Sequence, residues 1–134
     1  MDLPPKTTQF GWTGDGGVGE RLIQQIIDGT KTATCTFAAA CSAAEAEEIR
    51  SGRGELYTVT DAGARPRCII RVTDVFDTTF GNPDARLVHG EGDGSDTARF
   101  QADHRIAWEA TLPDVPLADD AVLIVEVFEL ISAL

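Results

Sequence analysis

The apolar positions near the start of the chain change from a helical period to an extended one. Four apolar residues recur at i, i+1, i+4 and i+5, which places them on one stripe of a helix. They are Leu22, Ile23, Ile26 and Ile27. The spacing predicts a helix over residues 19–28, ended by Gly29 in a left-handed cap. The Thr-, Ala-, Cys- and Phe-rich segment that follows favours a strand through Phe37.

After Phe37, segments with a helical pattern alternate along the chain with segments that have a strand pattern. Ser42 and Glu45 have the spacing of a capping box and predict a short helix over residues 43–50. Period-two alternation predicts strands. These strands span 55–61, 67–76 and 121–131. Within the second of them, Asp74 is expected on the same face as Cys68, Ile70 and Val72.

Three other regions complete the pattern. Residues 1–18 hold two prolines and four glycines and are expected to form an N-terminal arm that lies over the body. The polar, glycine-rich residues 77–96 predict a long loop, with Ser95 capping the next helix. On that helix a stripe of apolar character includes His104, which we expect to be a packed core histidine. The stripe consists of Phe100, His104, Ala107 and Trp108.

The order of these elements fits no βαβ repeat. Four or five strands with three or four inserted helices predict an α+β fold around a small mixed β-barrel. A length of 134 residues suits one domain over 1–134. The sequence has no apolar run long enough for a membrane span and no features of a signal peptide at its start, so we expect a cytoplasmic protein with no membrane partner.

Charge narrows the range of ligands. Twenty-two acidic against 11 basic residues give a net charge of −11, which argues against a large DNA or RNA footprint. A small or lightly charged ligand fits better. Arg65, Arg67 and Arg71 lie close together in sequence and are either a local phosphate patch or a solvated face.

The cysteines and histidines predict no metal site. Cys35, Cys41 and Cys68 show no C-x-x-C spacing, and no phosphate loop or dinucleotide fingerprint is present, so no cofactor is expected. His89 and His104 with the nearby carboxylates lack a fixed ligand spacing. Cys35 could be a nucleophile, but strand alternation turns it away from the face that Thr34 uses.

The stretch Gly29-Thr30-Lys31-Thr32-Ala33-Thr34 carries the candidate chemistry. It places an amine and hydroxyls at a helix-to-strand corner, where a side chain is held firmly and can still face a ligand. Amide hydrolysis needs a nucleophile, a base and a group that holds the oxyanion. Thr34, Lys31 and the backbone amides near Gly29 could fill these roles in that order. The alternative is structural, with Lys31 at the helix C-terminus and Thr34 as an ordinary strand threonine.

Together with these residues, five other segments make the chain resemble the ASCH-domain family, which has a PUA-like barrel fold. The first segment is Phe10-Gly11-Trp12, and the next two are the strand pair Val59-Thr60-Asp61 and Cys68 to Val75. The last two are the acidic loop Gly90-Glu91-Gly92-Asp93-Gly94-Ser95 and the final strand segment Val125 to Leu130. The resemblance implies a cleft that handles RNA or a modified nucleoside. One branch of the family hydrolyses N4-acetylcytidine with the lysine and threonine of this motif and a later acid.

Carried onto this chain, the resemblance gives the catalytic candidates Lys31 and Thr34, with either Glu91 or Asp93 as the acid. His89 stands where the fuller family pattern has a glutamate. Further contacts to a ligand are expected from Trp12, Gly29, Thr32, Arg71 and Ser95. The leading hypothesis is an amidohydrolase acting on an acylated cytidine, and the alternative is a non-catalytic module that binds RNA or a nucleotide. In either case the partner is a nucleoside-like molecule or short RNA.

Overall fold

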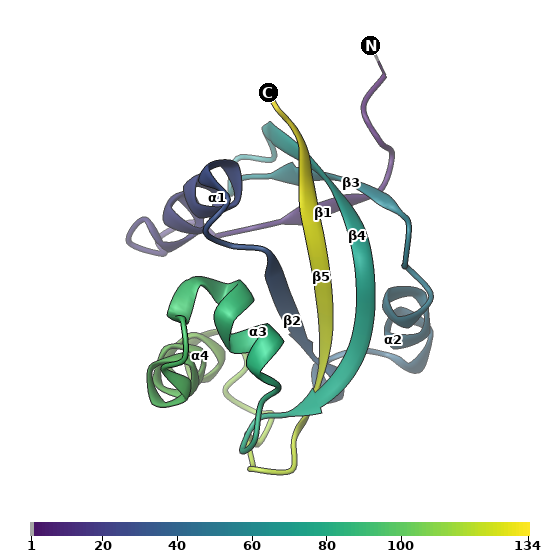
Figure 1. Ribbon diagram of the computed structural model, residues 1–134. Helices are drawn as coiled ribbons and strands as arrows, with labels where there is room; N and C mark the ends of the chain where they lie inside the picture. The colour runs from purple at the N-terminus through teal and green to yellow at the C-terminus, as the bar shows by residue number, and fades with distance from the viewer. Residues whose placement is uncertain (1) are drawn as a thin grey trace.

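A curved five-stranded sheet forms the centre of the protein, with four α-helices around it (Figure 1). The computed structural model describes residues 2–134. The strands are β1 (Thr7–Gln9), β2 (Ala33–Phe37), β3 (Leu56–Thr60), β4 (Pro66–Thr79) and β5 (Val122–Ala133). The helices are α1 (Val18–Asp28), α2 (Ala43–Arg50), α3 (Ala85–Val88) and α4 (Thr97–Thr111), with short turns η1 (Ala38–Ala40) and η2 (His89–Asp93). The fold is therefore α+β, as predicted.

The strand order is β1-β3-β4-β5-β2, with β1 parallel to β3 and every other pair antiparallel. Among residues 2–134 no ladder joins the edge strands β1 and β2, so the predicted closed barrel is wrong. The sheet is nevertheless strongly curled, because Thr8 of β1 and Thr34 of β2 line the same cavity. It is an open sheet whose two edges approach each other across that cavity.

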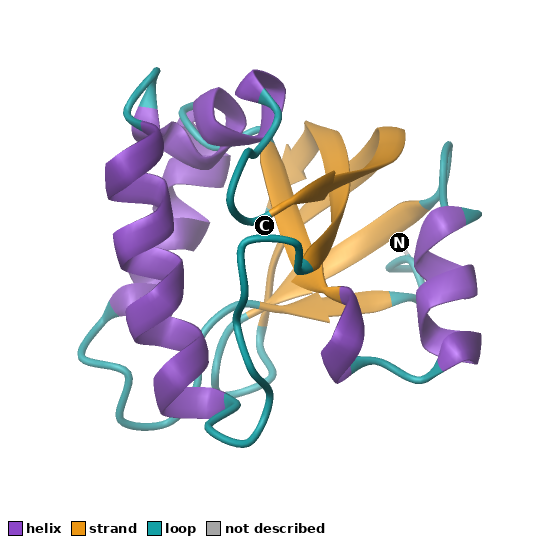
Figure 2. Cartoon of the chain, turned by 90° about the horizontal axis from the view of Figure 1, so that it is seen from below, coloured by secondary structure: helices purple, strands orange, loops and turns teal. Residues whose placement is uncertain are grey.

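Each face of the sheet supports its own apolar cluster. On the concave face, α1 packs Ile23 and Ile26 against strand residues that include Val59. On the opposite face, Leu87 of α3 and Phe100 of α4 pack with Val125. Helix α2 lies across the strands from α3 and α4, as Figures 1 and 2 show. No helix within residues 2–134 combines the length and apolar character needed to cross a bilayer.

The long strand β4 changes face part way along. Its register against β5 shifts between Val72 and Asp74, which marks a bulge at Thr73. Before the bulge, Val72 lies opposite Phe128 of the concave cluster, whereas Asp74 lies opposite Val127 of the other cluster. The prediction that Asp74 shares a face with Val72 is therefore wrong, because one extra residue reverses the alternation.

Two segments predicted to be irregular are in fact ordered. Residues 7–9 of the expected arm form β1, and Phe10 continues the pairing by donating its amide to Thr60 O at 3.0 Å. The expected loop over 77–96 contains the end of β4, α3 and η2. Asp96, and not Ser95, caps α4 by accepting from the Arg99 amide. The capping box of Ser42 and Glu45 is confirmed, and α2 has the predicted bounds.

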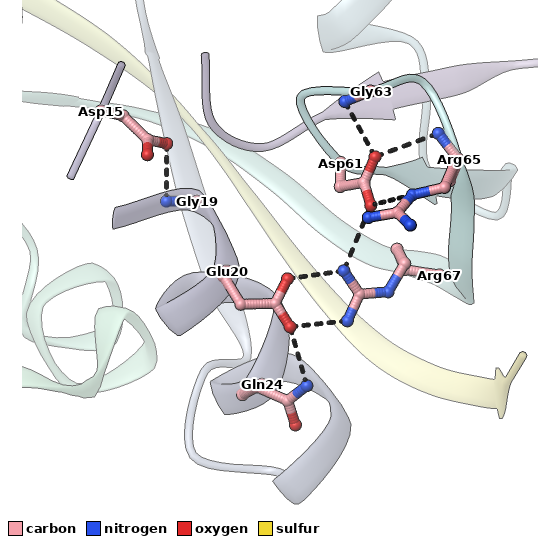
Figure 3. A network of polar contacts seen from close by, with 8 residues as sticks. All are labelled: Asp15, Gly19, Glu20, Gln24, Asp61, Gly63, Arg65 and Arg67. Carbon is pink, nitrogen blue, oxygen red and sulfur yellow. Dashed lines mark hydrogen bonds and ion pairs between the residues drawn. The ribbon is translucent and has the colours of Figure 1, made fainter. Parts of the chain in front are cut away.

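A charged network ties α1 to the β3–β4 turn (Figure 3). Arg67 donates to both carboxylate oxygens of Glu20 on α1, and its Nη1 lies 3.3 Å from Asp61 Oδ2. Asp61 also accepts from the amides of Gly63 and Arg65. The hydrogen bonds from Arg67 hold the pKa of Glu20 at about 2. Arg65 and Arg67 are thus engaged with carboxylates and do not form a free phosphate patch.

We expect Arg67→Met to lower the free energy of unfolding at pH 7. Glu20 has a folded pKa below its ordinary value of 4.5, so its contribution is present above pH 4.5 and is lost as the pH falls towards 2. The deficit of the variant should therefore shrink over that interval. Urea unfolding at several pH values measures it. Arg71→Met, which removes an exposed pair with Glu129 at 3.5 Å, is the control and should have little effect.

Candidate functional site

The corner between α1 and β2 is fixed by backbone hydrogen bonds. Gly29 caps α1 with φ of 86°, in the left-handed region that glycine adopts without strain. Asp28 Oδ1 accepts from the Thr30 amide at 2.9 Å, and the Lys31 amide donates to Gln25 O at 3.0 Å. The corner therefore directs Lys31 into the protein, whereas the sequence analysis expected a side chain that faces a ligand.

Lys31 is a buried charged side chain with only 2% of its surface exposed. Its Nζ donates to Ala33 O at 2.7 Å and lies 3.1 Å from Glu91 Oε2. The carbonyl of Thr32 accepts from the Phe128 amide of β5, so the next carbonyl, that of Ala33, points to the open edge of β2. The amine of Lys31 consequently lies at this open edge, between the two faces of the sheet.

Glu91 is delivered to Lys31 by the η2 turn. The Thr32 amide donates to Gly90 O at 2.7 Å, which docks the turn onto the start of β2. A Cβ at Gly90 would lie 2.5 Å from Ala33 Cβ, so this close approach requires glycine. The glycine-rich segment is therefore a docked element, and the acid that contacts Lys31 is Glu91. Asp93 instead lies 3.6 Å from Arg99.

His104 completes a half-buried polar cluster with Glu91 and Cys35. Its Nε2 lies 3.5 Å from Glu91 Oε2, and its Nδ1 donates to Phe100 O at 2.9 Å, since that carbonyl can only accept. Ligand atoms of Cys35, Glu91 and His104 all lie within 4.8 Å of one another. His104 is thus packed on the predicted stripe, and it is also a member of the site, which the sequence analysis missed.

Burial and the charges within the cluster together determine the pKa values of its members. Burial raises the pKa of Glu91, but the charge of Lys31 and the hydrogen bond from His104 outweigh it and hold that pKa at about 2. Burial lowers the pKa of His104, whereas contacts with Cys35 and Glu91 raise it to about 11. Because burial raises the pKa of the Cys35 thiol, this group is protonated at neutral pH, and Glu91 supplies the negative charge.

This cluster is a poor metal site and a poor thiol-nucleophile site. The Lys31 ammonium already neutralises the same Glu91 oxygen that a cation would need. A protonated, buried Cys35 is an inert thiol. Lys31, Glu91 and His104 therefore form a hydrogen-bonded acid–base group at the edge of β2.

A cavity of about 210 Å³ opens on the concave face, and none of the acid–base residues Lys31, Glu91 and His104 is among its lining residues. It is lined by Thr34 and Thr36 of β2, and Phe10 is common to both features, because its ring lies 5.8 Å from Lys31 Nζ. Strand alternation turns Cys35 to the opposite face, as predicted. The remaining lining residues are Thr7, Thr8, Ile49, Tyr57, Ile70, Val72, Glu126 and Phe128.

Several other predicted contacts lie away from the cavity. Arg71 follows Ile70 on β4, points to the other face and pairs with Glu129. Ser95 lies on a separate hollow beside His89, and Trp12 is 39% exposed on the loop before α1. Residues from Gly29 to Thr32 also cannot hold an oxyanion through their amides. These amides donate to Ile26 O, Asp28 Oδ1, Gln25 O and Gly90 O.

Glu126 and Tyr57 are cavity residues that sequence reasoning missed. A signal was available for Glu126, because it is the single charged residue in the otherwise apolar run from Ala121 to Phe128. Tyr57 had no such signal, since an aromatic residue is ordinary in a strand.

The fold and the motif together define the class of this protein. The ASCH-domain family model matches residues 7–132, so the chain belongs to the ASCH-domain family. Two solved structures illustrate the fold. Protein EF3133 from Enterococcus faecalis V583 has a TM-score of 0.79 at 24% identity, with 99% of this chain and 80% of that one covered.

The second structure is an ASCH domain from Lactobacillus crispatus JV V101, with a TM-score of 0.76 at 22% identity. The match covers 96% of this chain and 82% of that chain. At these identities the likeness extends to the fold. A comparison with curated proteins finds no match.

Proposed function

We propose that the protein is an amidohydrolase that removes the acyl group from an N4-acylated cytidine such as N4-acetylcytidine. The observation that carries the proposal is the buried contact of 3.1 Å between Lys31 Nζ and Glu91 Oε2 at the open edge of β2. This edge lies beside a cavity into which Thr34 projects. A positioned amine and a nearby hydroxyl are the minimum for acyl transfer to threonine.

In the proposed reaction, Thr34 Oγ1 attacks the acyl carbonyl carbon, and the minor fraction of Lys31 that has lost its proton accepts the hydroxyl proton, since the ammonium paired with Glu91 cannot act as a base. Collapse of the tetrahedral intermediate breaks the bond between the carbonyl carbon and N4, and Lys31 returns the proton to N4. Water then hydrolyses the threonine ester and releases the carboxylic acid. Glu91 positions the Lys31 amine, and His104 positions Glu91.

The oxyanion needs donors other than the amides of the corner. Tyr57 and Thr36 line the cavity, and within residues 2–134 their hydroxyls have no protein hydrogen-bond partner. A hydroxyl directed at the developing oxyanion stabilises the transition state by electrostatic preorganisation. We assign this role to one of these two hydroxyls.

Size and charge favour a nucleoside over a long RNA. A cavity of about 210 Å³ is smaller than the roughly 300 Å³ at which pockets for drug-sized ligands begin, so it suits one base. The net charge of −11 also disfavours an extended phosphate footprint.

We expect the purified protein to release acetate and cytidine from N4-acetylcytidine. Chromatography of the nucleoside products measures this, with a panel of other acylated nucleosides as the comparison for specificity. A protein that turns over no member of the panel, yet binds short RNA with an affinity that falls steeply with salt, would establish the non-catalytic binding module instead.

A further inference from the structure

The cavity contains a carboxyl group that the proposed acid–base group does not use. Glu126 lies on strand β5, between β4 and β2, directly opposite Thr34 in the β2–β5 register. Both residues line the cavity. Directly opposed residues in an antiparallel pair have Cβ atoms about 5 Å apart. A ligand within reach of the Thr34 hydroxyl is therefore also within reach of the Glu126 carboxyl.

Glu126 has no protein partner in the described part of the chain. Neither an ion pair nor a side-chain hydrogen bond engages its carboxyl within residues 2–134, although Val125 beside it is buried and Val127 is half-buried. Every fully enclosed side-chain nitrogen or oxygen within residues 2–134 has a hydrogen-bond partner. The oxygens of Glu126 have none, so they are accessible from the cavity. The hydroxyls of Thr34 and Tyr57 are unpartnered in the same way. Accessible polar groups that no protein group engages are free to bind a ligand that enters the cavity.

The surroundings of Glu126 shift its carboxyl towards the neutral form. Burial raises the pKa of this carboxyl above its ordinary value, and no cation among the cavity residues opposes the shift. The other titratable group of the lining is Tyr57, whose pKa is also raised, in the first place by burial. A protonated carboxyl group has one O–H donor next to one carbonyl acceptor.

The O–H donor and carbonyl acceptor of a neutral carboxyl group match one edge of the cytosine base. The Watson–Crick edge of cytosine presents the ring-nitrogen acceptor N3 beside the N4–H donor. A neutral carboxyl can donate to N3 and accept from N4–H in one planar, two-hydrogen-bond contact. An N4-acylated cytosine retains one N4–H and so retains this edge.

We propose that Glu126 is the specificity-determining residue of the cavity, and that it holds a cytosine-like ring by the edge formed by N3 and N4–H. The inference rests on the proposed function for the identity of the base. It adds a ligand-binding group from β5 that lies opposite the proposed nucleophile. Flat aromatic and aliphatic side chains, Phe10 and Phe128 among them, supply the apolar part of the lining.

The test compares Glu126→Gln with Glu126→Ala. Glutamine is nearly the same size and offers an NH donor beside a carbonyl acceptor at every pH, so it should preserve the contact. Alanine removes it. We expect calorimetric titration with cytidine to give parental affinity within a few fold for Glu126→Gln and a loss of about tenfold or more for Glu126→Ala. Glu129→Gln, an exposed glutamate on the same strand, is the matched control and should bind as the parent does.

Each other outcome overturns the inference. Parental affinity in Glu126→Ala would mean that the carboxyl does not contact the base. Equal losses in the Gln and Ala variants would mean that the negative charge, and not the donor–acceptor pair, is what matters. A parent protein that binds no cytidine would also reject it. Thermal unfolding of both variants checks that they are folded, and the near-isosteric Gln variant keeps the test valid if the Ala variant is not.

Hydrolysis of N4-acetylcytidine is measured in parallel, which separates the two proposals. A parent that binds cytidine through Glu126 but hydrolyses nothing would reject the amidohydrolase and keep this inference. A parent that hydrolyses the substrate, with KM unchanged in Glu126→Ala, would reject this inference and keep the amidohydrolase.

Discussion

Replacing Thr34 with valine should reduce the turnover of N4-acetylcytidine by about 10³-fold or more. Valine keeps the branched shape of threonine but has no hydroxyl to attack the acyl carbon, and the loss of a nucleophile removes most of the rate enhancement. The Thr34 hydroxyl has no protein hydrogen-bond partner within the described residues, so the fold should be little affected. Single-turnover and steady-state assays measure the loss.

Thr8→Val is the matched control, because Thr8 of β1 lines the same cavity and has no role in the proposed reaction. It should retain close to parental turnover. Adding Lys31→Met to Thr34→Val should cause little further loss, since nucleophile and base act as a unit. Parental turnover in Thr34→Val would show that the hydroxyl is not the nucleophile.

Glu91→Gln should lower the free energy of unfolding by about 3–5 kcal/mol at pH 7. The substitution leaves the Lys31 ammonium buried without its counter-charge, and breaking a buried pair on one side is strongly destabilising. Urea unfolding monitored by tryptophan fluorescence measures the change. Glu55→Gln is the control: it removes an exposed contact of 3.7 Å with Lys6 and should cost less than about 1 kcal/mol.

The loss of stability in Glu91→Gln should depend on pH. Glu91 has a folded pKa of about 2 against an ordinary value of 4.5, so its stabilisation is complete above pH 4.5 and is lost as the pH falls towards 2. The deficit of Glu91→Gln should shrink over that interval. The double variant Lys31→Met and Glu91→Gln should recover part of the stability at pH 7. Equal deficits in the single and double variants would show that the charge pair is not the cause.

Local signals in the sequence predicted the elements well. The capping box at Ser42 and the glycine cap at Gly29 fixed two helix ends, since each depends on side chains within a few residues. The bulge at Thr73 and the pairing of β1 with β3 could not be predicted, because both depend on which segments meet in the folded sheet. Closure of the sheet was over-predicted for the same reason.

The candidate site was predicted in part. The corner at Lys31 is visible in sequence because it follows from a helix cap and a change of period. The choice of Glu91 over Asp93 depends on how η2 docks at Gly90, which is a long-range contact. His104 was interpreted from its helical stripe alone, and a stripe shows which face is packed but does not show which polar group lies opposite it.

The bulge at Thr73 also determines how the whole chain holds together. Because β4 reverses its alternation there, Ile70 belongs to the concave cluster and Phe76 belongs to the cluster under α3 and α4. Strand β5 likewise contributes Phe128 to one cluster and Val125 to the other. Neither cluster can release these two strands without exposing the apolar surface of the other. The two cores are therefore energetically coupled, and the cavity of one and the acid–base group of the other are formed and lost in the same cooperative event.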